Sequence, residues 1–538
     1  MNYLKKINGL PYLLLVALIT VLYGQFLWNP IVFDDIYFFL LDNDGNQPVS
    51  NYHFSLLELR SLPYATLAWT KAWFGLDLIN FRVGNLLLHI AVALSLFGFL
   101  SRLFAGVLGD SRSQTLSPQW TAFFAALLFA MHPVSTYAVG YLVQRTIVMA
   151  TLFSLLALVM YVKGSTQQKP IWLWLSVPLY YLAVFSKEHA IMLPAVMMAL
   201  TVLLHNDWQD KLKQRWGIWL ALLVFAIIVV LSRKSLLGSV YEIRAPEMLL
   251  DAKLAYPLSV LTQAWLFFKY MFLWAFPNPA WMSIDMREPF APAILSRYLV
   301  AAFCFLAWGI GAIWLLLKRG LPGLAGFGLL FPWLMFMTEF SSVRIQEVFV
   351  LYRSYLWVPG VFCLLPAVTY RLKARSTALV LAAIVLTMFP LSMGRLMTLS
   401  HPVLLWDDAE KLVKERPGLP GVDRIYYNRG TQLIHINKPD AAIADLKQAI
   451  ALSPGFVEAH GNLGAAYIKK SDWLNAVAAF SQAIEIAKGK GKMTSARHFD
   501  GRAQALEALG QVEKAQADYR ESCRLGKRAC DKVTTLSR

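Results

Sequence analysis

Long apolar runs alternate with short polar segments over most of residues 1–397. A helix crosses a bilayer with about 20 mostly apolar residues, because each residue adds only ~1.5 Å along the helix axis. The pattern therefore predicts a polytopic bundle of about eleven membrane-spanning helices. Their expected ranges are 10–27, 81–104, 120–139, 143–162, 171–185, 190–204, 216–231, 298–317, 321–338, 354–370 and 377–394.

Residues 258–276 form an ambiguous apolar segment. They are long enough to cross a membrane, but Gln263 and Lys269 interrupt them. If they crossed, the later basic clusters at 318–319 and 371–375 would both change sides of the membrane. We therefore place the segment as a helix lying on the outer interface. The alternative is that residues 258–276 form a further membrane-spanning helix.

Composition agrees with a membrane protein. The chain is 57% hydrophobic with a mean hydropathy of +0.49, which is too apolar for a soluble globular protein. The net charge of +17 indicates membrane orientation rather than nucleic-acid binding, because the basic residues gather in short loops between spans. These loops and the N-terminus are predicted to be cytoplasmic. An odd number of spans then places the C-terminus and the two long loops, 29–80 and 232–297, on the outer side.

The first apolar run, residues 10–27, follows a basic start and resembles a signal peptide in that respect. No small-residue cleavage site follows it before Trp28 and Asn29. We therefore interpret it as a retained first helix.

The composition turns polar towards the C-terminus, where a 34-residue period appears. This period is typical of the tetratricopeptide repeat (TPR), whose two helices pack closely through small residues at fixed positions. We predict repeats at about 423–456, 457–490 and 496–529, within a C-terminal domain, 398–538, that follows a membrane domain, 1–397. The expected fold class is all-α, a membrane helix bundle followed by a TPR α-solenoid. An unrelated array of helical hairpins is the alternative.

The four cysteines fall into two pairs. Cys304 and Cys363 lie in apolar spans, whereas Cys523 and Cys530 lie in the polar tail and are the disulfide candidates. Seven residues of unbroken helix would separate them by roughly 10 Å, which is too far to bridge. The prediction therefore requires the helix to end near Gly526.

Two adjacent carboxylates, Asp34 and Asp35, follow the outer end of the first span. Burying a charge near lipid is costly, so we expect both in the mouth of the first outer loop. A carboxylate there can take a proton from an acceptor hydroxyl or hold a divalent metal ion. The alternative is a helix cap at a charged membrane boundary.

Charged side chains also mark the outer ends of later spans. His132 lies in the outer half of the third span, Arg145 opens the fourth, and Lys187 and Glu188 follow the fifth. Guanidinium is a planar fork of donors that suits phosphate, and a lysine on the outer side runs against the usual charge bias. We interpret Arg145 and Lys187 as candidate phosphate ligands and His132 and Glu188 as supporting residues. A histidine bonded to backbone and a simple interfacial ion pair are the alternatives.

The short outer loop after the ninth span is also rich in charge. It contains Arg344, Glu347, Tyr352 and Arg353. Arg353 enters the membrane boundary from outside, where a pyrophosphate would lie, so it is a candidate phosphate ligand, with Glu347 and Tyr352 in support. The alternative is interfacial snorkelling beside an aromatic belt. Glu339 receives no role and is interpreted as a packing group.

The order and spacing of these motifs resemble the GT-C superfamily of polyprenyl-phosphate-sugar glycosyltransferases, most closely the transmembrane-and-TPR family of O-mannosyltransferases and its bacterial relatives. The likeness covers most of the chain. Departures at Ser61, Ser135 and His189 leave the sugar open. The likeness rests on Phe33-Asp34-Asp35, Phe74-Gly75-Leu76, Asn85-Leu86-Leu87-Leu88-His89, Phe129-Ala130-Met131-His132-Pro133-Val134 with Arg145, Ser186-Lys187-Glu188, Tyr352-Arg353-Ser354-Tyr355-Leu356 and the TPR array.

This resemblance implies a GT-C-type bundle and an inverting enzyme that moves a sugar from a polyprenyl-phosphate-linked donor to a hydroxyl of a protein acceptor on the outer face. It implies Asp34 or Asp35 as the base and Arg145, Lys187 and Arg353 as ligands of the lipid phosphate. No cofactor beyond the lipid-linked donor is expected, and the use of a divalent metal stays open.

The expected location is the bacterial inner membrane, with the TPR domain in the periplasm recruiting an acceptor protein and no nucleic acid as partner. Two alternatives remain. One is a ligase or polymerase that moves a whole glycan from a lipid carrier. The other is a non-catalytic membrane scaffold built around the TPR domain.

Overall fold

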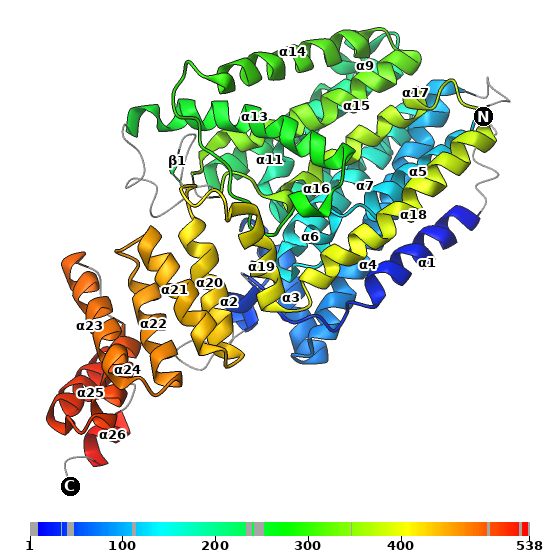
Figure 1. Cartoon of the computed structure of the whole chain (residues 1–538). Helices are drawn as coiled ribbons and strands as arrows, with labels where there is room; N and C mark the ends of the chain where they lie inside the picture. The colour runs from blue at the N-terminus through cyan, green and yellow to red at the C-terminus, as the bar shows by residue number, and fades with distance from the viewer. Residues whose placement is uncertain are drawn as a thin grey trace. The chain divides into compact units, whose positions relative to one another are not determined.

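The chain divides into two units (Figure 1). Unit 1 comprises Met1–Ile284 and Phe290–Ser400, and unit 2 comprises Asp285–Pro289 and His401–Arg538. The structure is a computed structural model. It describes residues 9–33, 35–39, 48–109, 115–232, 239–240, 252–345, 347–491, 495–526 and 530–535.

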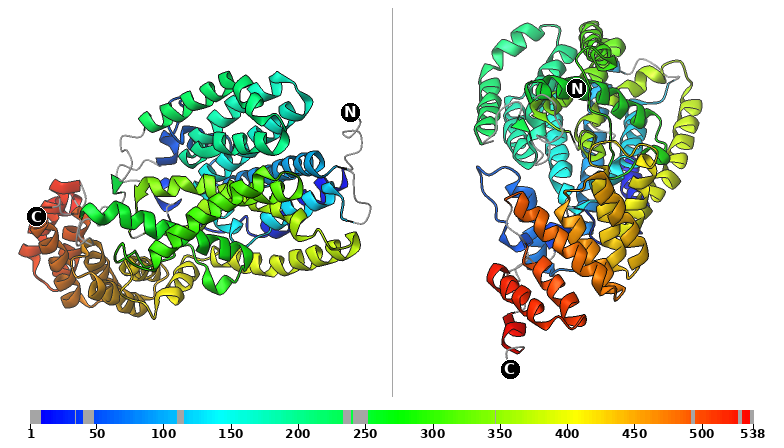
Figure 2. Two further views of the ribbon diagram at one scale, coloured as in Figure 1. Left: turned by 90° about the horizontal axis from the view of Figure 1, so that it is seen from above. Right: turned by 60° about the vertical axis from the view of Figure 1, so that its left-hand side comes forward.

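Unit 1 is a bundle whose long helices run side by side (Figure 2). The helices that cover predicted spans are α1 (Leu10–Gly24), α4 (Leu78–Leu108), α5 (Pro118–Ala130), α7 (Arg145–Gln167), α8 (Pro170–Ser186), α9 (Leu193–Leu204), α11 (Trp216–Ser232), α14 (Arg297–Leu317), α15 (Gly320–Phe336), α16 (Ser354–Trp357), α17 (Leu365–Val368) and α18 (Ala374–Thr398).

Further elements connect these helices. The α-helices among them are α2 (Asp35–Phe39), α3 (Ser61–Phe74), α6 (Ser135–Val139), α10 (Trp208–Gln214) and α13 (Ala255–Ala275). The 3-10 helices are η2 (Pro48–Asn51), η3 (Leu142–Gln144), η4 (Glu188–Met192), η5 (Ala252–Leu254), η6 (Pro279–Trp281), η7 (Met337–Ser341), η8 (Leu351–Arg353) and η9 (Val358–Leu364). Two short strands, β1 (Ser239–Val240) and β2 (Ser342–Val343), pair in parallel.

The apolar helices match the predicted spans one to one. Within the described residues, six helices are long and apolar enough to cross a membrane, the bent pair α10 and α11 makes a seventh, and four shorter apolar helices cover the remaining ranges. The prediction of a polytopic helical fold is thereby confirmed. Helix α13, which contains most of the ambiguous segment 258–276, is not among the helices of the described chain that meet this criterion.

Two of the predicted spans are not uniform α-helices. The range 120–139 is divided into α5 and α6, with Pro133 between them. The range 354–370 is divided into α16, η9 and α17 and contains Pro359 and Pro366. Proline lacks a backbone N–H and its ring collides with the preceding turn, so the regular hydrogen-bond ladder stops at these positions.

Helices α14 and α15 approach very closely. A Cβ atom added to Gly326 of α15 would lie 2.3 Å from the backbone nitrogen of Leu316 and 2.7 Å from the carbonyl oxygen of Ala312, both in α14. Helices in lipid associate through packing rather than through exclusion of water, so a small residue at the crossing point is required.

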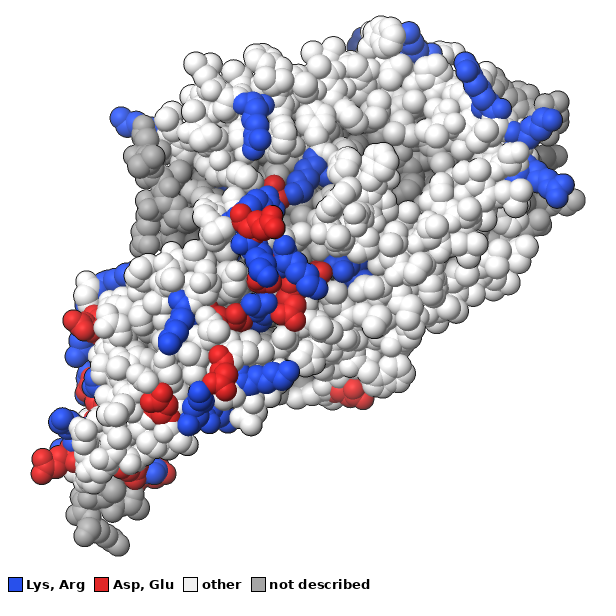
Figure 3. Space-filling model, in the orientation of Figure 1, with Lys and Arg blue, Asp and Glu red and all other residues white. Residues whose placement is uncertain are grey.

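We expect a reporter that is active only in the cytoplasm to stay silent when it is fused after Arg538. Eleven spans that begin inside must end outside. Lys and Arg side chains gather over the beginning of α18, and an uncharged surface continues from there along the helix (Figure 3). Basic residues favour the cytoplasmic side, so the loop before α18 is expected to lie there. The same reporter inserted after Lys318 is the control and should be active. Activity after Arg538 would mean that the number of crossings is even, with α13 as the first segment to reconsider.

Unit 2 contains three helical hairpins that stack in chain order from α20 to α25 (Figure 1). Each hairpin falls within one predicted repeat. A Cβ added to Gly430 would lie 2.9 Å from Cγ of Leu446, and one added to Gly464 would lie 2.7 Å from the Phe480 ring, so small residues permit the close approach of paired helices. The helices of unit 2 are α19 (Pro402–Val413), α20 (Val422–His435), α21 (Pro439–Leu452), α22 (Val457–Lys469), α23 (Trp473–Gly489), α24 (Ala496–Ala508), α25 (Val512–Gly526) and α26 (Cys530–Thr535).

Helix α19 precedes the repeats and was not predicted. Its buried residues include Leu405, Ala409 and Val413, spaced four apart on one face, which packs against α20. Arg429 of α20 holds it further, because its Nη1 lies 3.0 Å from Asp407 and 3.5 Å from Glu410. This spacing was visible in the sequence, but the helix falls outside the 34-residue period.

The segment Asp285–Pro289 belongs to unit 2, although the long loop 232–297 was assigned to the membrane domain. Arg287 is 1% exposed and its Nη2 lies 2.5 Å from Asp285. Gly421 has a φ of +80°, and a Cβ there would collide with the Arg287 guanidinium. Glycine at this position therefore provides both the left-handed turn and the space for Arg287.

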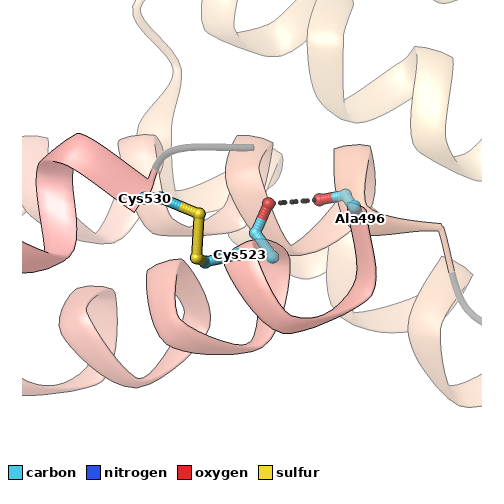
Figure 4. The surroundings of a disulfide bond; sticks show 4 residues. Ala496, Cys523 and Cys530 are labelled. Atoms are coloured by element: carbon cyan, nitrogen blue, oxygen red, sulfur yellow. Dashed lines mark hydrogen bonds between the residues drawn. A yellow bond between two sulfur atoms is a disulfide. The ribbon is translucent and has the colours of Figure 1, made fainter. Parts of the chain in front are cut away.

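Helix α25 ends at Gly526, and a disulfide joins Cys523 to Cys530, the first residue of α26 (Figure 4). The two Cα atoms are 4.9 Å apart. The adjacent Ser522 hydroxyl donates a hydrogen bond to the carbonyl oxygen of Ala496 at 3.0 Å, which ties α25 to the start of α24. The helix therefore ends at Gly526, as the prediction required.

We expect Cys523 and Cys530 to resist alkylation in protein that is isolated and unfolded under non-reducing conditions. Peptide mass spectrometry of unfolded protein checks this, with Cys304 as the internal control because it should be alkylated in every sample. After treatment with dithiothreitol, both cysteines should be labelled. Labelling of both without a reductant would contradict the disulfide.

Candidate functional site

Charged side chains, buried except for the partly exposed Arg60, gather where α8 and η4 meet η7, η8 and the start of α3. We call this group the ionic cluster. Four members are cations and two are carboxylates, so the cluster carries an excess of positive charge even when His189 is neutral. Its members are Arg60, Lys187, Glu188, His189, Glu339, Arg344 and Arg353.

Glu339 is the centre of the ionic cluster. Its Oε2 accepts hydrogen bonds from Nη1 of Arg344 at 3.0 Å and from Nη1 of Arg353 at 3.1 Å. Nε2 of His189 lies 3.4 Å from its Oε1. Glu339 is only 1% exposed, and a buried carboxylate requires such cationic partners. The two arginines are thereby held side by side.

Arg60 and Glu188 form a second pair in the cluster. The Arg60 guanidinium binds both carboxylate oxygens, and its Nε lies 3.0 Å from Oε2. The backbone N–H of Arg60 also donates to the carbonyl oxygen of Phe185 at 2.6 Å. These contacts tie the start of α3 to the end of α8 and fix the first long loop against the cluster.

The Lys187 ammonium has no hydrogen-bond or ion-pair partner within the part of the chain that the structure describes. Lys187 follows α8 directly and is 8% exposed. Burial, and then the nearby charge of Arg60, lowers the pKa of Lys187 to about 7. An anion beside it would favour the protonated ammonium, so anion binding here is coupled to proton uptake and weakens as the pH rises above about 7.

Asp35 is fully buried, which corrects the expectation that it lies in an open loop mouth. Its two carboxylate oxygens accept hydrogen bonds from the backbone N–H groups of Leu142, at 3.1 Å, and Val143, at 2.9 Å. These amides begin η3, which leads into α7, and a carboxylate at a helix N-terminus satisfies amides that lack partners within the helix. Asp34 lies outside the described residues.

Arg145 is directed into the bundle. Its Nε donates to Asn85 at 2.7 Å, its Nη2 donates to the carbonyl oxygen of Phe81 at 2.8 Å, and its Nη1 lies near the hydroxyls of Thr66 and Thr70. The side chain is 2% exposed. Arg145 therefore joins α7 to α3 and α4, and its contacts do not include any member of the ionic cluster.

His132 is also part of a packing network. The backbone N–H of Val134 donates to its Nδ1 at 3.2 Å, so the ring proton lies on Nε2, which donates to the carbonyl oxygen of Trp274 at 3.1 Å. The imidazole stacks on the Trp274 ring, with centroids 4.1 Å apart. His132 therefore fastens the break after α5 to α13.

The structure thus brings Lys187, Glu188 and Arg353 together and adds Arg60 and Glu339, which were not predicted as site residues. Glu347 and Tyr352 lie in the segment between β2 and the end of η8, and the Tyr352 ring contacts Tyr141. Within the described residues, no group of three or more His, Cys, Asp or Glu side chains is arranged to hold a metal ion.

Unit 2 has a separate pocket of about 520 Å³ in the TPR solenoid. Helices α20, α22, α23 and α24 contribute its lining, which mixes aromatic and aliphatic side chains with Glu458, Lys469, Arg497 and Asp500. A mixed lining of this kind suits a peptide segment better than a small charged ligand.

Comparison with known proteins finds a match to one repeat family model and similarity to protein O-mannosyl-transferases over about a quarter of the chain. The tetratricopeptide repeat family model matches residues 423–456, the first predicted repeat. Protein O-mannosyl-transferase TMTC2 of Mus musculus is 35% identical over 136 residues, which are 25% of this chain and 14% of the relative. Protein O-mannosyl-transferase TMTC4 of Homo sapiens is 32% identical over 126 residues, 22% of this chain and 17% of the relative.

These matches span only a small part of each relative's length, 14% and 17%. Among solved structures, the crystal structure of MamA protein is similar over 29% of this chain and 85% of its own, with 23% identity and a TM-score of 0.21.

Proposed function

We propose that the chain is a membrane glycosyltransferase that moves a sugar from a polyprenyl-phosphate-linked donor to a hydroxyl of a protein acceptor on the outer face of the membrane. The observation that carries the proposal is the ionic cluster. It places an excess of buried positive charge at the ends of apolar helices, where the phosphate of a lipid anchored in the bilayer would lie.

The ionic cluster suits a phosphate that becomes the leaving group. Glu339 holds Arg344 and Arg353 in fixed positions, and Lys187 supplies an ammonium without a described partner. Cations that are already in place need no reorganisation as negative charge builds up on the departing phosphate. Arg145, with its partners inside the bundle, acts in this proposal by positioning α7 rather than by touching the donor.

The proposed base is Asp34, and Asp35 is its positioning neighbour. Both oxygens of Asp35 are bound to backbone amides in a fully buried site, so Asp35 holds the first loop on the N-terminus of η3 and α7. Asp34 then takes the proton of the acceptor hydroxyl, which attacks the anomeric carbon from the side opposite the phosphate and inverts the configuration. The assignment of Asp34 as the base follows from the predicted resemblance and from the hydrogen bonds of Asp35.

The TPR pocket is proposed to recruit the acceptor protein. The relatives' names, protein O-mannosyl-transferases, support a protein hydroxyl as acceptor and a hexose as the transferred group. The proposed location is the bacterial inner membrane with unit 2 in the periplasm. The described residues contain no group of three or more His, Cys, Asp or Glu side chains that could hold a metal ion, so a divalent metal forms no part of the proposal.

Mass spectrometry of periplasmic glycoproteins, from cells with and without this protein, tests the proposal. We expect one set of peptides to gain a single sugar only when the protein is present. Gain of a whole glycan would favour the ligase or polymerase alternative. Modified peptides that are unchanged in the protein's absence would contradict the proposed activity and leave a TPR scaffold as the better interpretation.

A further inference from the structure

A second pocket in unit 1 lies at the end of the bundle opposite the ionic cluster. The cluster contains Lys187 to His189, which join α8 to α9. The second pocket instead involves the beginning of α8, the end of α7, the residue after α9, and the junction of α10 with α11. Its volume is about 390 Å³, which is large enough for a phosphate group with a polar substituent.

The charged residues that line this pocket are cations. Arg215 is 8% exposed, and its Nη1 lies 2.8 Å from the Tyr161 hydroxyl and 3.3 Å from the Thr201 hydroxyl. Its Nη2 lies 3.2 Å from Nε2 of His205, whose pKa is lowered by burial and by Arg215 itself. The hydroxyl and imidazole partners orient the Arg215 guanidinium, and within the described part of the chain no carboxylate pairs with it.

Lys211 adds a second positive charge to the pocket. Its described acidic partner, Asp207, lies 3.5 Å away with a half-exposed side chain, and does not line the pocket. An exposed ion pair of this length contributes little. Among the described residues, the pocket has two cations, Lys211 and Arg215, in its lining and no carboxylate.

A buried hydroxyl in the lining points to a missing hydrogen-bonding ligand. Ser165 is 2% exposed, and its Oγ has no hydrogen-bond partner within the described residues. A buried polar atom without a partner is costly, so a ligand oxygen in the pocket would satisfy it. The pocket also contains the first residues of two long helices, Pro170 of α8 and Trp216 of α11, and helix N-termini favour negative charge.

The surface beside the pocket is apolar and exposed. Trp216 is 69% exposed and Trp174 is 48% exposed, and both line the pocket. Beyond them, α11 buries only Ile218, Leu222 and Val229 along its length. Tryptophan is enriched where a helix meets the lipid headgroups, and an exposed apolar helix surface is suited to contact acyl chains.

We propose that this pocket binds the headgroup of an anionic phospholipid, with the phosphate between Lys211, Arg215 and the Ser165 hydroxyl and the acyl chains along α8 and α11. The continuity of a cationic pocket with a lipid-facing helix surface distinguishes a phospholipid from a soluble phosphate. The site is separate from the ionic cluster and does not depend on the proposed glycosyltransferase activity.

Native mass spectrometry of the full chain in detergent, with equimolar phosphatidylglycerol and phosphatidylcholine, tests this site. We expect the wild-type protein to retain phosphatidylglycerol preferentially. Lys211→Gln should lower that preference about fivefold, the contribution expected of one basic residue at a lipid surface. Lys211 is partly exposed, so the variant should fold, and Lys373→Gln, before α18, is the matched control that should keep the preference.

Equal retention of the two lipids by the wild type would overturn the proposal. So would an equal loss in Lys211→Gln and Lys373→Gln, because that would indicate general attraction of charge rather than a built site. Glycerol 3-phosphate is the soluble probe in a further arm. If it competes with phosphatidylglycerol at equal concentration, the acyl chains contribute nothing and the lipid assignment is wrong.

Discussion

Replacing Asp34 by Asn is expected to lower the rate of sugar transfer by about 10²- to 10⁴-fold, the contribution of a positioned general base. Asparagine is nearly isosteric but cannot accept the proton of the acceptor hydroxyl. The yield and melting temperature of the protein should therefore stay unchanged. The measurement is the initial rate at which membranes that contain the variant label an acceptor protein from a radiolabelled lipid-linked sugar.

Asp35→Asn is the informative partner variant. In the wild type, the backbone amides of Leu142 and Val143 each donate to one carboxylate oxygen of Asp35. The asparagine side chain would place its NH₂ group, a donor, opposite one of these two amides. Leaving a buried donor without an acceptor costs about 1–3 kcal/mol, so we expect a lower melting temperature for this variant alone. Normal transfer by Asp34→Asn would contradict the base assignment. A loss of stability in Asp34→Asn equal to that in Asp35→Asn would show that both residues serve the fold.

Arg353→Ala is expected to raise the KM for the lipid-linked donor about 10- to 100-fold, because hydrogen bonds to charged groups contribute about 1.5–3 kcal/mol. The kcat should change less, since the phosphate is present before and after transfer. Glu339 keeps its contact with Arg344 in this variant, so no carboxylate is left without a cation. Initial rates over a range of donor concentrations separate the two constants.

Two further variants make the Arg353 result specific. Arg353→Lys keeps the charge but loses the planar fork, and it should fall between wild type and Arg353→Ala. Arg371→Ala removes an exposed arginine between α17 and α18, and its KM should equal that of the wild type. An unchanged KM in Arg353→Ala would remove Arg353 from the donor site. A fall in kcat alone would instead assign it to the transition state.

Part of the candidate site was readable from the sequence, because charged residues at the ends of apolar runs are rare and conspicuous. Lys187, Glu188 and Arg353 stand out in this way, and all three lie in the ionic cluster. Arg145 stood out equally, yet its guanidinium is bound by Asn85 and the Phe81 carbonyl inside the bundle. Position along a span therefore identifies an unusual charge but not the partner that accounts for it.

Glu339 is the opposite case, a member of the ionic cluster that the sequence did not identify as a site residue. It looked like a packing group because it follows an apolar span, and one signal was overlooked, namely that a carboxylate at membrane depth needs cations nearby. Arg344 is only five residues away, but His189 is far away in sequence and reaches Glu339 only because η4 packs against η7.

The sequence by itself determined the number and order of the apolar helices and the first TPR repeat. Both signals are local: hydropathy over about 20 residues decides whether a segment can cross lipid, and small residues at a fixed period decide whether neighbouring helices can pair. Only the tertiary structure decided that Asp35 caps η3 ahead of α7, that Arg145 serves the bundle, and that Glu339 assembles the cationic site. A buried charge is stable only with partners, and those partners come from helices whose packing no local pattern specifies.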